Sequence, residues 1–240
     1  TMSFYAKTES GTLNFKYGNV SYENVSGTAT TEWQKFEITQ IPPTASRYPK
    51  IQTTEIGSLL LWGFQVEQLP YATSYIPTAG STVTRTQETC IGAGNVSTFN
   101  STEGVLYAEM AALADDNTYR YVTINDGTDQ NVVAIRFSNT SNQILAFTRI
   151  SGAFNAVLLT TSYSTVNFNK IAYRYKSGDF SLFINGTKIG SSTSTQTLSA
   201  NTLNALSFDN APFSKMHGKV KDLRVYNTAL SDEDLQKLTS

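Results

Sequence analysis

The sequence predicts an all-β protein built from two antiparallel β-sandwiches, with one short helix at the C-terminus. Short segments in which apolar and polar residues alternate, rich in β-branched and aromatic side chains, recur along the 240 residues. Clusters of Gly, Asn, Ser and Pro separate these segments and supply turn residues. No helical pattern alternates with them, as a parallel α/β fold would require.

The N-terminal part supplies four predicted strands, over residues 2–8, 11–18, 32–40 and 57–67. Alternation fails around Trp33, so we expect a bulge or a strand end there. A closed sandwich usually needs about seven or eight strands. Residues 1–70 are therefore predicted to form a partial sandwich, with further strands expected upstream of Thr1.

Residues 71–94 fit neither a helix nor a strand. The stretch "YATSYIPTAG" has no helical period, and Pro77 fixes φ and removes one backbone donor. Tyr71, Tyr75 and Ile76 offer apolar anchors, and a salt bridge between Arg85 and Glu88 is expected at the exit. We interpret residues 71–94 as an ordered strap between two domains, in contrast to a flexible Gly/Ser linker.

Residues 95–240 are predicted to form the second, more complete sandwich. Its turns include "NDGTD" at 125–129 and "NGT" at 185–187, whose Asp-Gly and Asn-Gly pairs favour tight hairpins. The predicted strands are 104–111, 119–125, 131–138, 143–150, 154–161, 168–176, 179–185, 187–191, 203–209 and 218–226.

A helix is predicted at the end of the chain, in "LSDEDLQKLTS". Ser231 is the expected N-cap and is followed by acidic residues in the first turn, where they favour the helix dipole. Leu235 and Leu238 form one apolar side, so we expect the helix to dock on the sandwich.

Composition excludes several classes of function. Charged residues make up 15 % of the chain and the net charge is −1, with no basic run, so no nucleic-acid partner is expected. No apolar run approaches the ~20 residues of a membrane span, so no membrane insertion is expected. One cysteine, Cys90, and one histidine, His217, form neither an internal disulfide nor a structural zinc site.

Three segments resemble known families. The stretch "LWGFQVEQLPYATSYIPTAGSTVTRTQE" resembles the end of carbohydrate-binding-module-like jelly rolls in phage and prophage structural proteins. "SLFINGTKIGS" and "GKVKDLRVYNTALSDEDLQKL" resemble the hairpin and the closing strand and helix of concanavalin A-like, or laminin G-like, domains. The resemblance implies a partial jelly roll followed by a lectin-like sandwich, in a tail-fibre or head-fibre protein.

Catalysis is not expected from the sequence, although the concanavalin A-like fold hosts both lectins and glycosidases. Retaining glycosidases need two carboxyl groups about 5–5.5 Å apart. Glu103 and Glu109 share a strand face but lie six residues apart, and Asp115 and Asp116 fall in a predicted loop. His217 lacks a nucleophile partner in any recognisable motif.

Sugar binding and calcium binding remain as candidate activities. Tyrosine rings can stack on a sugar ring while arginines orient its hydroxyl groups. The carbohydrate-binding candidates, which alternate on two strands, are Tyr119, Arg120, Tyr121, Tyr173, Arg174 and Tyr175. Arg136 and Arg149 also fall on strands and are expected, with Arg120 and Arg174, to line solvated faces. Candidate calcium ligands, which are equally good turn residues, are Asp126, Asp129, Asp209 and Asn210.

These observations predict a non-catalytic virion appendage protein that binds host cell-surface polysaccharide. Its expected location is the virion surface, outside the cell. Its expected partners are other virion proteins and further copies of itself. Appendages of this kind are commonly trimeric, so a trimer is the expected oligomer. Two alternatives stay open. One is a structural or decoration protein that makes only protein contacts, and the other is a polysaccharide-degrading enzyme.

Overall fold

The computed structural model describes residues 1–19, 25–39, 49–81, 83, 93–211 and 213–240. The chain divides into two compact units, Thr1–Gln87 and Glu88–Ser240. All the sheets are antiparallel, and the predicted all-β class is confirmed. Arg85, Glu88 and Cys90, and with them most of the second half of the expected strap, lie outside the described residues.

The N-terminal unit contains two three-stranded sheets, β4-β1-β6 and β3-β2-β5. Alternate residues of β1 point between the sheets, as the period of two requires, and the ring of Phe4 lies 5.3 Å from that of Tyr17. Phe36, directly opposite Phe4 on the neighbouring strand of the same sheet, stacks on it at 5.7 Å. The strands are β1 (Met2–Thr8), β2 (Leu13–Asn19), β3 (Val25–Ala29), β4 (Gln34–Ile38), β5 (Pro49–Thr53) and β6 (Leu59–Val66).

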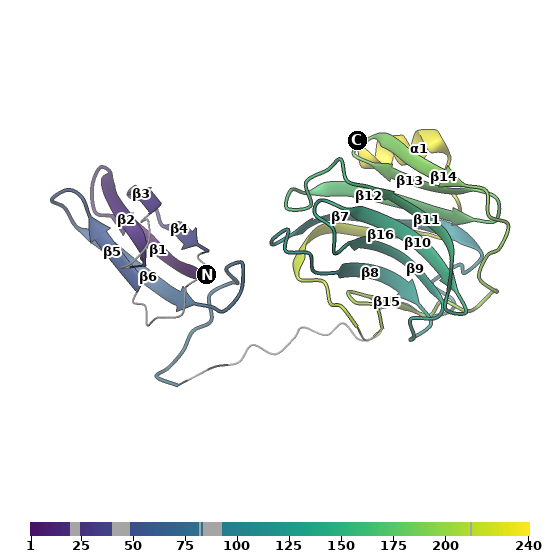
Figure 1. Ribbon diagram of the computed structural model, residues 1–240, viewed down its shortest axis with the longest axis horizontal. Helices are drawn as coiled ribbons and strands as arrows, with labels where there is room; N and C mark the ends of the chain where they lie inside the picture. The colour runs from purple at the N-terminus through teal and green to yellow at the C-terminus, as the bar shows by residue number, and fades with distance from the viewer. Residues whose placement is uncertain (20–24, 40–48, 82, 84–92, 212) are drawn as a thin grey trace. The chain divides into compact units, whose positions relative to one another are not determined.

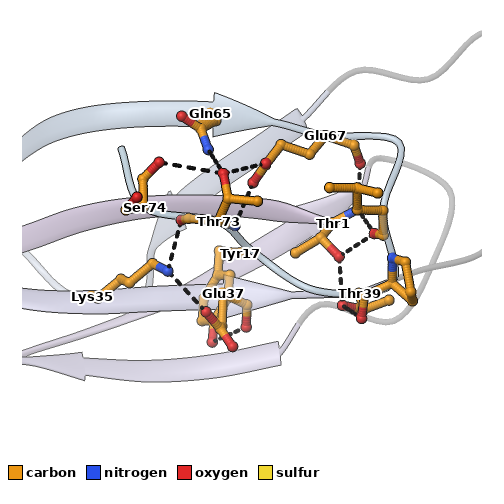
Figure 2. Close-up of polar contacts among 11 residues, drawn as sticks. Thr1, Tyr17, Lys35, Glu37, Thr39, Gln65, Glu67, Thr73 and Ser74 are labelled. Carbon is orange, nitrogen blue, oxygen red and sulfur yellow. Dashed lines mark hydrogen bonds and ion pairs between the residues drawn. The ribbon is translucent and has the colours of Figure 1, made fainter. Parts of the chain in front are cut away.

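Thr73 links the segment after β6 back to the first sheet (Figure 2). Its backbone N–H and its hydroxyl donate to the two carboxylate oxygens of Glu67, at 2.9 and 2.6 Å. Gln65 donates to the Thr73 hydroxyl at 3.2 Å and accepts from the Ile76 N–H at 3.0 Å. Lys35, on β4, donates to the Thr73 carbonyl. Side chains of two strands therefore hold this segment against the sheet.

Aromatic packing completes the attachment of this segment, which we call the clasp (residues 71–77). The rings of Trp62 and Tyr75 lie 4.7 Å apart, and Tyr5 lies 5.1 Å from Trp62. Gly63 has a positive φ of 64°, and a Cβ there would lie 3.2 Å from the Tyr5 ring and 3.4 Å from the Tyr75 ring. Glycine is therefore required both by the backbone and by the close approach of two rings.

The C-terminal unit is a sandwich of two five-stranded sheets (Figure 1). We call β11-β10-β9-β8-β15 the front sheet and β14-β13-β12-β7-β16 the back sheet. The helix α1 (Asp232–Thr239) contacts β12, β13 and β14 of the back sheet. The strands are β7 (Glu103–Ala112), β8 (Arg120–Asn125), β9 (Val132–Phe137), β10 (Ile144–Ile150), β11 (Ala153–Thr160), β12 (Asn169–Lys176), β13 (Phe180–Ile184), β14 (Thr187–Ser192), β15 (Ala205–Ser207) and β16 (Gly218–Tyr226).

The main core lies between the front and back sheets. Val122, Ile135 and Ala146 of the front sheet face Leu106 and Tyr173 of the back sheet, and all are fully buried. The tight turns follow the predicted chemistry, since Asn185 and Gly186 between β13 and β14 have φ values of 48° and 77°. Within the described part of the chain, no helix has the length and apolar character that a membrane span requires.

Candidate functional site

The outer faces of the two sheets of the C-terminal unit differ in what covers them. On the back sheet, Leu235 of α1 is fully buried against Val105, Tyr107 and Phe183. The helix thus closes an apolar patch in the way that its predicted apolar side suggested. No helix among the described residues contacts the strands of the front sheet in the same way, and its outer face carries a row of aromatic rings.

This row crosses the front sheet from the start of β8 to β11. The rings of Tyr119 and Tyr121 lie 6.1 Å apart, Tyr121 and Phe147 6.4 Å, and Phe147 and Phe154 5.1 Å. Tyr119 is half-buried and Phe154 is 51 % exposed, whereas Phe147 is fully buried beneath its neighbours. The ends of the row are therefore open to solvent and its centre is sealed.

Two arginines lie over this row. The guanidinium carbon of Arg136 is 4.8 Å from the centre of the Tyr119 ring and 5.4 Å from that of Phe147. The guanidinium carbon of Arg149 is 4.5 Å from the Phe154 ring and 5.7 Å from Phe147. A guanidinium at such distances is attracted to the ring face. The two arginines cover Phe147 and alternate with the aromatic rings along the surface.

The row and its arginines form the candidate site, which we call the front-face site (Tyr119, Tyr121, Arg136, Phe147, Arg149 and Phe154). Its members come from β8, β9, β10 and β11 and from the residue before β8. Strand register brings them together, because Tyr121 lies directly opposite Arg136 and Arg136 directly opposite Leu145. An aromatic surface with adjacent hydrogen-bond donors suits a sugar ring, which offers C–H groups to the rings and hydroxyls to the donors.

The four tyrosine candidates differ in exposure: Tyr119 is half-exposed, whereas Tyr121 is 5 % exposed. Tyr119 and Tyr121 share the outer face of the front sheet, as predicted. Tyr173 and Tyr175 also share a face, but it is the inner one, where they are 0 % and 1 % exposed. Burial raises the pKa of both hydroxyls above the ordinary range. The expectation that this second pair contacts a ligand is wrong, because neither ring offers a face to solvent.

Arg120 and Arg174 do not line solvated faces, contrary to expectation. Arg120 is 2 % exposed, and its guanidinium donates to the carbonyls of His217 and Thr118 and pairs with Asp116 at 2.8 Å. Burial raises the pKa of Asp116, but the hydrogen bond and charge of Arg120 outweigh it, so the pKa lies below its usual value. Arg120 is a structural residue at the end of the sandwich.

Arg174 is 5 % exposed and lies under the approach to α1. It donates to the Leu230 carbonyl at 2.8 Å and pairs with Asp179 and with Asp232, the latter at 2.8 Å. The expectation holds for Arg136 and Arg149, which are partly exposed. Neither arginine was expected to contact a ligand. The spacing of Phe147 and Arg149 places those two on one face of a strand, whereas the position of Arg136 beside Tyr121 depends on strand pairing.

The predicted calcium ligands fall into two separate turns. Asp126 accepts hydrogen bonds from Thr128 and Asn131, and Asp129 pairs with Arg149 at 3.3 Å. Asp209 accepts from the Ala211 N–H in the second turn, where the side-chain oxygen of Asn210 is buried without a donor. Among the residues with described positions, no group of three or more His, Cys, Asp or Glu side chains is arranged around a metal position. Calcium binding stays a prediction.

Acidic residues near the sheets are engaged by cations. Glu103 pairs with Lys176 at 3.1 Å, and Glu109 pairs with Lys221 at 3.2 Å, both on the back sheet. The five strands of the front sheet contain no aspartate or glutamate. His217 is exposed and contributes its backbone carbonyl to Arg120. The front-face site therefore holds no pair of carboxyl groups.

Comparison with known families identifies the C-terminal unit. The model of the concanavalin A-like lectin/glucanases superfamily matches residues 82–236. The chain belongs to this superfamily. No curated protein matches the chain.

Solved structures similar to this chain at low sequence identity include the following three. A carbohydrate-binding module, CBM40, of the Ruminococcus gnavus IT-sialidase, bound to α2,3-sialyllactose, is 16 % identical, with a TM-score of 0.48, over 62 % of this chain and 84 % of that chain. Domain 4 of the arabinanase AbnA from Geobacillus stearothermophilus, in complex with arabinotriose, is 15 % identical (TM-score 0.48; 61 % and 70 % covered). A pentraxin from Limulus polyphemus is 11 % identical (TM-score 0.48; 62 % and 73 % covered).

Proposed function

We propose that this chain is a non-catalytic glycan-binding protein whose front-face site binds host cell-surface polysaccharide. The observation that carries the proposal is the aromatic row with its two arginines on the sheet face that no described helix covers. Membership of a superfamily that contains lectins agrees with it, although the same fold also supports hydrolases. The partly exposed rings, Tyr119 and Phe154, lie at the two ends of the row, which suits a polymer lying along the sheet.

The proposal of a non-catalytic role is supported by the chemistry of the front sheet. Hydrolysis of a glycosidic bond by the usual mechanism needs two carboxyl groups on either side of that bond. The front-sheet strands provide none, and the nearest acidic side chain of the site, Asp129, is paired with Arg149. The arginines and tyrosines of the site hold and orient a ligand without a group suited to protonate a leaving oxygen.

We further propose that the protein works on the outside of a bacteriophage virion, beside other virion proteins and as a homo-oligomer. The support is the resemblance of the segment over residues 61–88 to phage structural proteins. Packing of the clasp explains why these residue types occur together in the motif. Trp62 and Gly63 lie beside Tyr75, and Gln65 donates to Thr73. Measurement of the molar mass in solution tests the oligomer, and a monomer would contradict it.

Replacement of Tyr119 by alanine tests glycan binding. Loss of the half-exposed ring is expected to weaken the affinity for a glycan identified on an array by about tenfold, or about 1.4 kcal/mol, as expected for an aromatic contact. The control is Tyr226→Ala on the back sheet, which removes a partly buried ring from the opposite face. An array on which the full chain binds no glycan would contradict the proposal, as would a Tyr119→Ala variant with unchanged affinity.

A role in protein contacts is the second candidate, and it is favoured by β6 of the N-terminal unit. Leu61, Trp62, Phe64 and Val66 on this strand are 46–66 % exposed, and β6 is an edge strand of its sheet. Exposed apolar edges commonly pair with another chain. Cross-linking that traps these residues against a virion protein, together with an array that shows no glycan bound, would favour this function over the first.

A further inference from the structure

Arg136 has hydrogen-bond donors directed to solvent. One guanidinium nitrogen, Nη1, donates to the Tyr121 hydroxyl at 2.7 Å. The Nε atom is buried against the rings and has no partner. The remaining nitrogen, Nη2, donates to no described residue and is not among the buried atoms, so it faces solvent. The guanidinium is thus fixed at its inner end and open at its outer edge.

The charge of Arg136 is not neutralised by the protein. Among the described residues, no carboxylate lies within ion-pair distance of it, whereas Arg149 pairs with Asp129 and Arg120 pairs with Asp116. No strand of the front sheet contributes an acidic side chain. Because the rings beneath Arg136 limit its contact with water, the positive charge is more effective there than at a fully exposed position. The front-face site is therefore electrostatically complementary to an anion.

We infer that the front-face site is specific for acidic glycans, and that Arg136 binds the carboxylate of a uronic-acid or sialic-acid residue. This inference rests on the proposed glycan-binding function. The planar guanidinium offers two donors along one edge, which match the two oxygens of a carboxylate. A single unpaired cation matches the single negative charge of such a sugar.

The neighbouring ring determines how the sugar lies. The Tyr119 ring centre is 4.8 Å from the guanidinium carbon, so both groups lie within reach of one monosaccharide unit. In this arrangement the apolar face of the sugar ring stacks on Tyr119 and its carboxylate extends to Nη1 and Nη2 of Arg136. Arg149, whose charge is offset by Asp129, orients Phe154 at 4.5 Å and adds donors for hydroxyl groups further along the polymer.

Binding of the full chain to four immobilised polymers tests this inference. The polymers are polygalacturonate and polysialic acid, which carry carboxylates, dextran sulfate, which carries sulfates, and dextran, which is neutral. The wild-type protein is expected to bind at least one carboxylate polymer at least about tenfold more tightly than dextran, and to weaken as salt rises from about 50 to 300 mM. Arg136→Gln is expected to abolish both the preference and the salt dependence.

Two further variants test whether the effect of Arg136 comes from its planar guanidinium or only from its charge, and whether it is specific to this arginine. Arg136→Lys keeps the charge but loses the planar fork, so it is expected to bind between the wild type and Arg136→Gln. Arg224→Gln is the matched control, because Arg224 lies 5.7 Å from the Tyr107 ring but is exposed on the back sheet and paired with Asp222. It is expected to leave binding unchanged. Thermal unfolding of each variant verifies the fold.

The outcomes distinguish this inference from the function on which it rests. Equal binding of dextran and both carboxylate polymers, preference for dextran sulfate over both, or wild-type affinity of Arg136→Gln would overturn the acidic specificity while leaving glycan binding in place. Binding to none of the four polymers, with an empty glycan array, would contradict the glycan-binding function itself.

Discussion

The front and back sheets of the C-terminal unit both place arginines on their outer faces, but in different electrostatic settings. On the back sheet, Arg174 pairs with Asp179 and Asp232, and Arg224 pairs with Asp222 at 2.6 Å. On the front sheet, Arg136 lies over Tyr119 and has no acidic partner among the described residues. Arg136 is therefore free to bind an anionic ligand, whereas the charges of Arg174 and Arg224 are already offset by carboxylates of the protein.

The exposure of these side chains also differs between the two faces. Arg174 is covered by the chain that leads into α1, and the helix buries Leu235 beneath it. The front face has partly exposed arginines between two partly exposed end rings, Tyr119 and Phe154. A face whose polar and apolar groups are both covered by the chain contributes to stability. A face on which they remain accessible is suited to a ligand, so mutations on the two faces are expected to have separable effects.

The largest expected effect is on stability, from Arg174→Met on the back face. The change removes two ion pairs and the hydrogen bonds to the Leu230 carbonyl and the Ser181 hydroxyl. We expect the free energy of unfolding to fall by about 3 kcal/mol, at the lower end for a buried pair because the two aspartates are half-exposed and rehydrate. Urea denaturation measures it.

If the Arg174→Met variant folds but loses glycan binding, the assignment of stability to the back face and of binding to the front face is contradicted. Arg224→Gln on the same face provides the reference for an exposed pair. Its side chain is 54 % exposed and its ion pair is screened by solvent, so the free energy of unfolding is expected to change little.

A second, smaller effect is expected from pH, through Asp232. The hydrogen bond from Lys188 is the largest influence on the pKa of this carboxyl and lowers it. Burial opposes this shift, but the charge and hydrogen bond of Arg174 add to it, so the pKa lies below its usual value. Since the folded pKa lies below the unfolded pKa of about 3.9, the contribution of Asp232 is fully present above pH 4. It is lost as pH falls through the lower, folded pKa.

Denaturation of the wild type and Asp232→Asn as a function of pH measures this contribution. The wild type is expected to be the more stable at neutral pH, and the two curves are expected to converge as the pH decreases below about 4. A difference that does not change with pH would show that the Arg174 and Lys188 pairs add nothing, and would remove the electrostatic distinction between the faces.

The fold was predictable from the sequence where alternation marks a buried face. The predicted bounds of β1 and β16 coincide with the structure, and α1 begins directly after the predicted cap. The strands β3 and β5 were missed. In β3, Gly27 takes the place of an apolar side chain because a Cβ there would lie 2.9 Å from the Phe15 ring, and β5 opens on Pro49 with a single apolar residue. Neither strand shows the periodic pattern.

The candidate site was predictable only in part, and the two tyrosine pairs show why. Tyr119 and Tyr121 have the same spacing as Tyr173 and Tyr175, and each pair shares a face. Period two establishes that alternate residues lie together, but it does not establish whether their face is turned to the core or to solvent. That choice depends on neighbouring strands. Likewise, the role of Arg136 follows from its position opposite Tyr121 and from the absence of an acid on the whole sheet.

The smallest expected effect concerns how firmly α1 closes the back face. The Ser231 hydroxyl accepts a hydrogen bond from the Asp234 N–H at 3.1 Å, and such caps contribute about 1 kcal/mol. Ser231→Ala is expected to raise the rate of hydrogen exchange in α1 without changing exchange in the front sheet. Gln236→Ala, at an exposed position within the helix, is the control and is expected to slow exchange slightly because alanine is the better helix former. If loosening the helix also changed glycan affinity, the two faces would be coupled through the core, and the division between a stabilising face and a binding face would not hold.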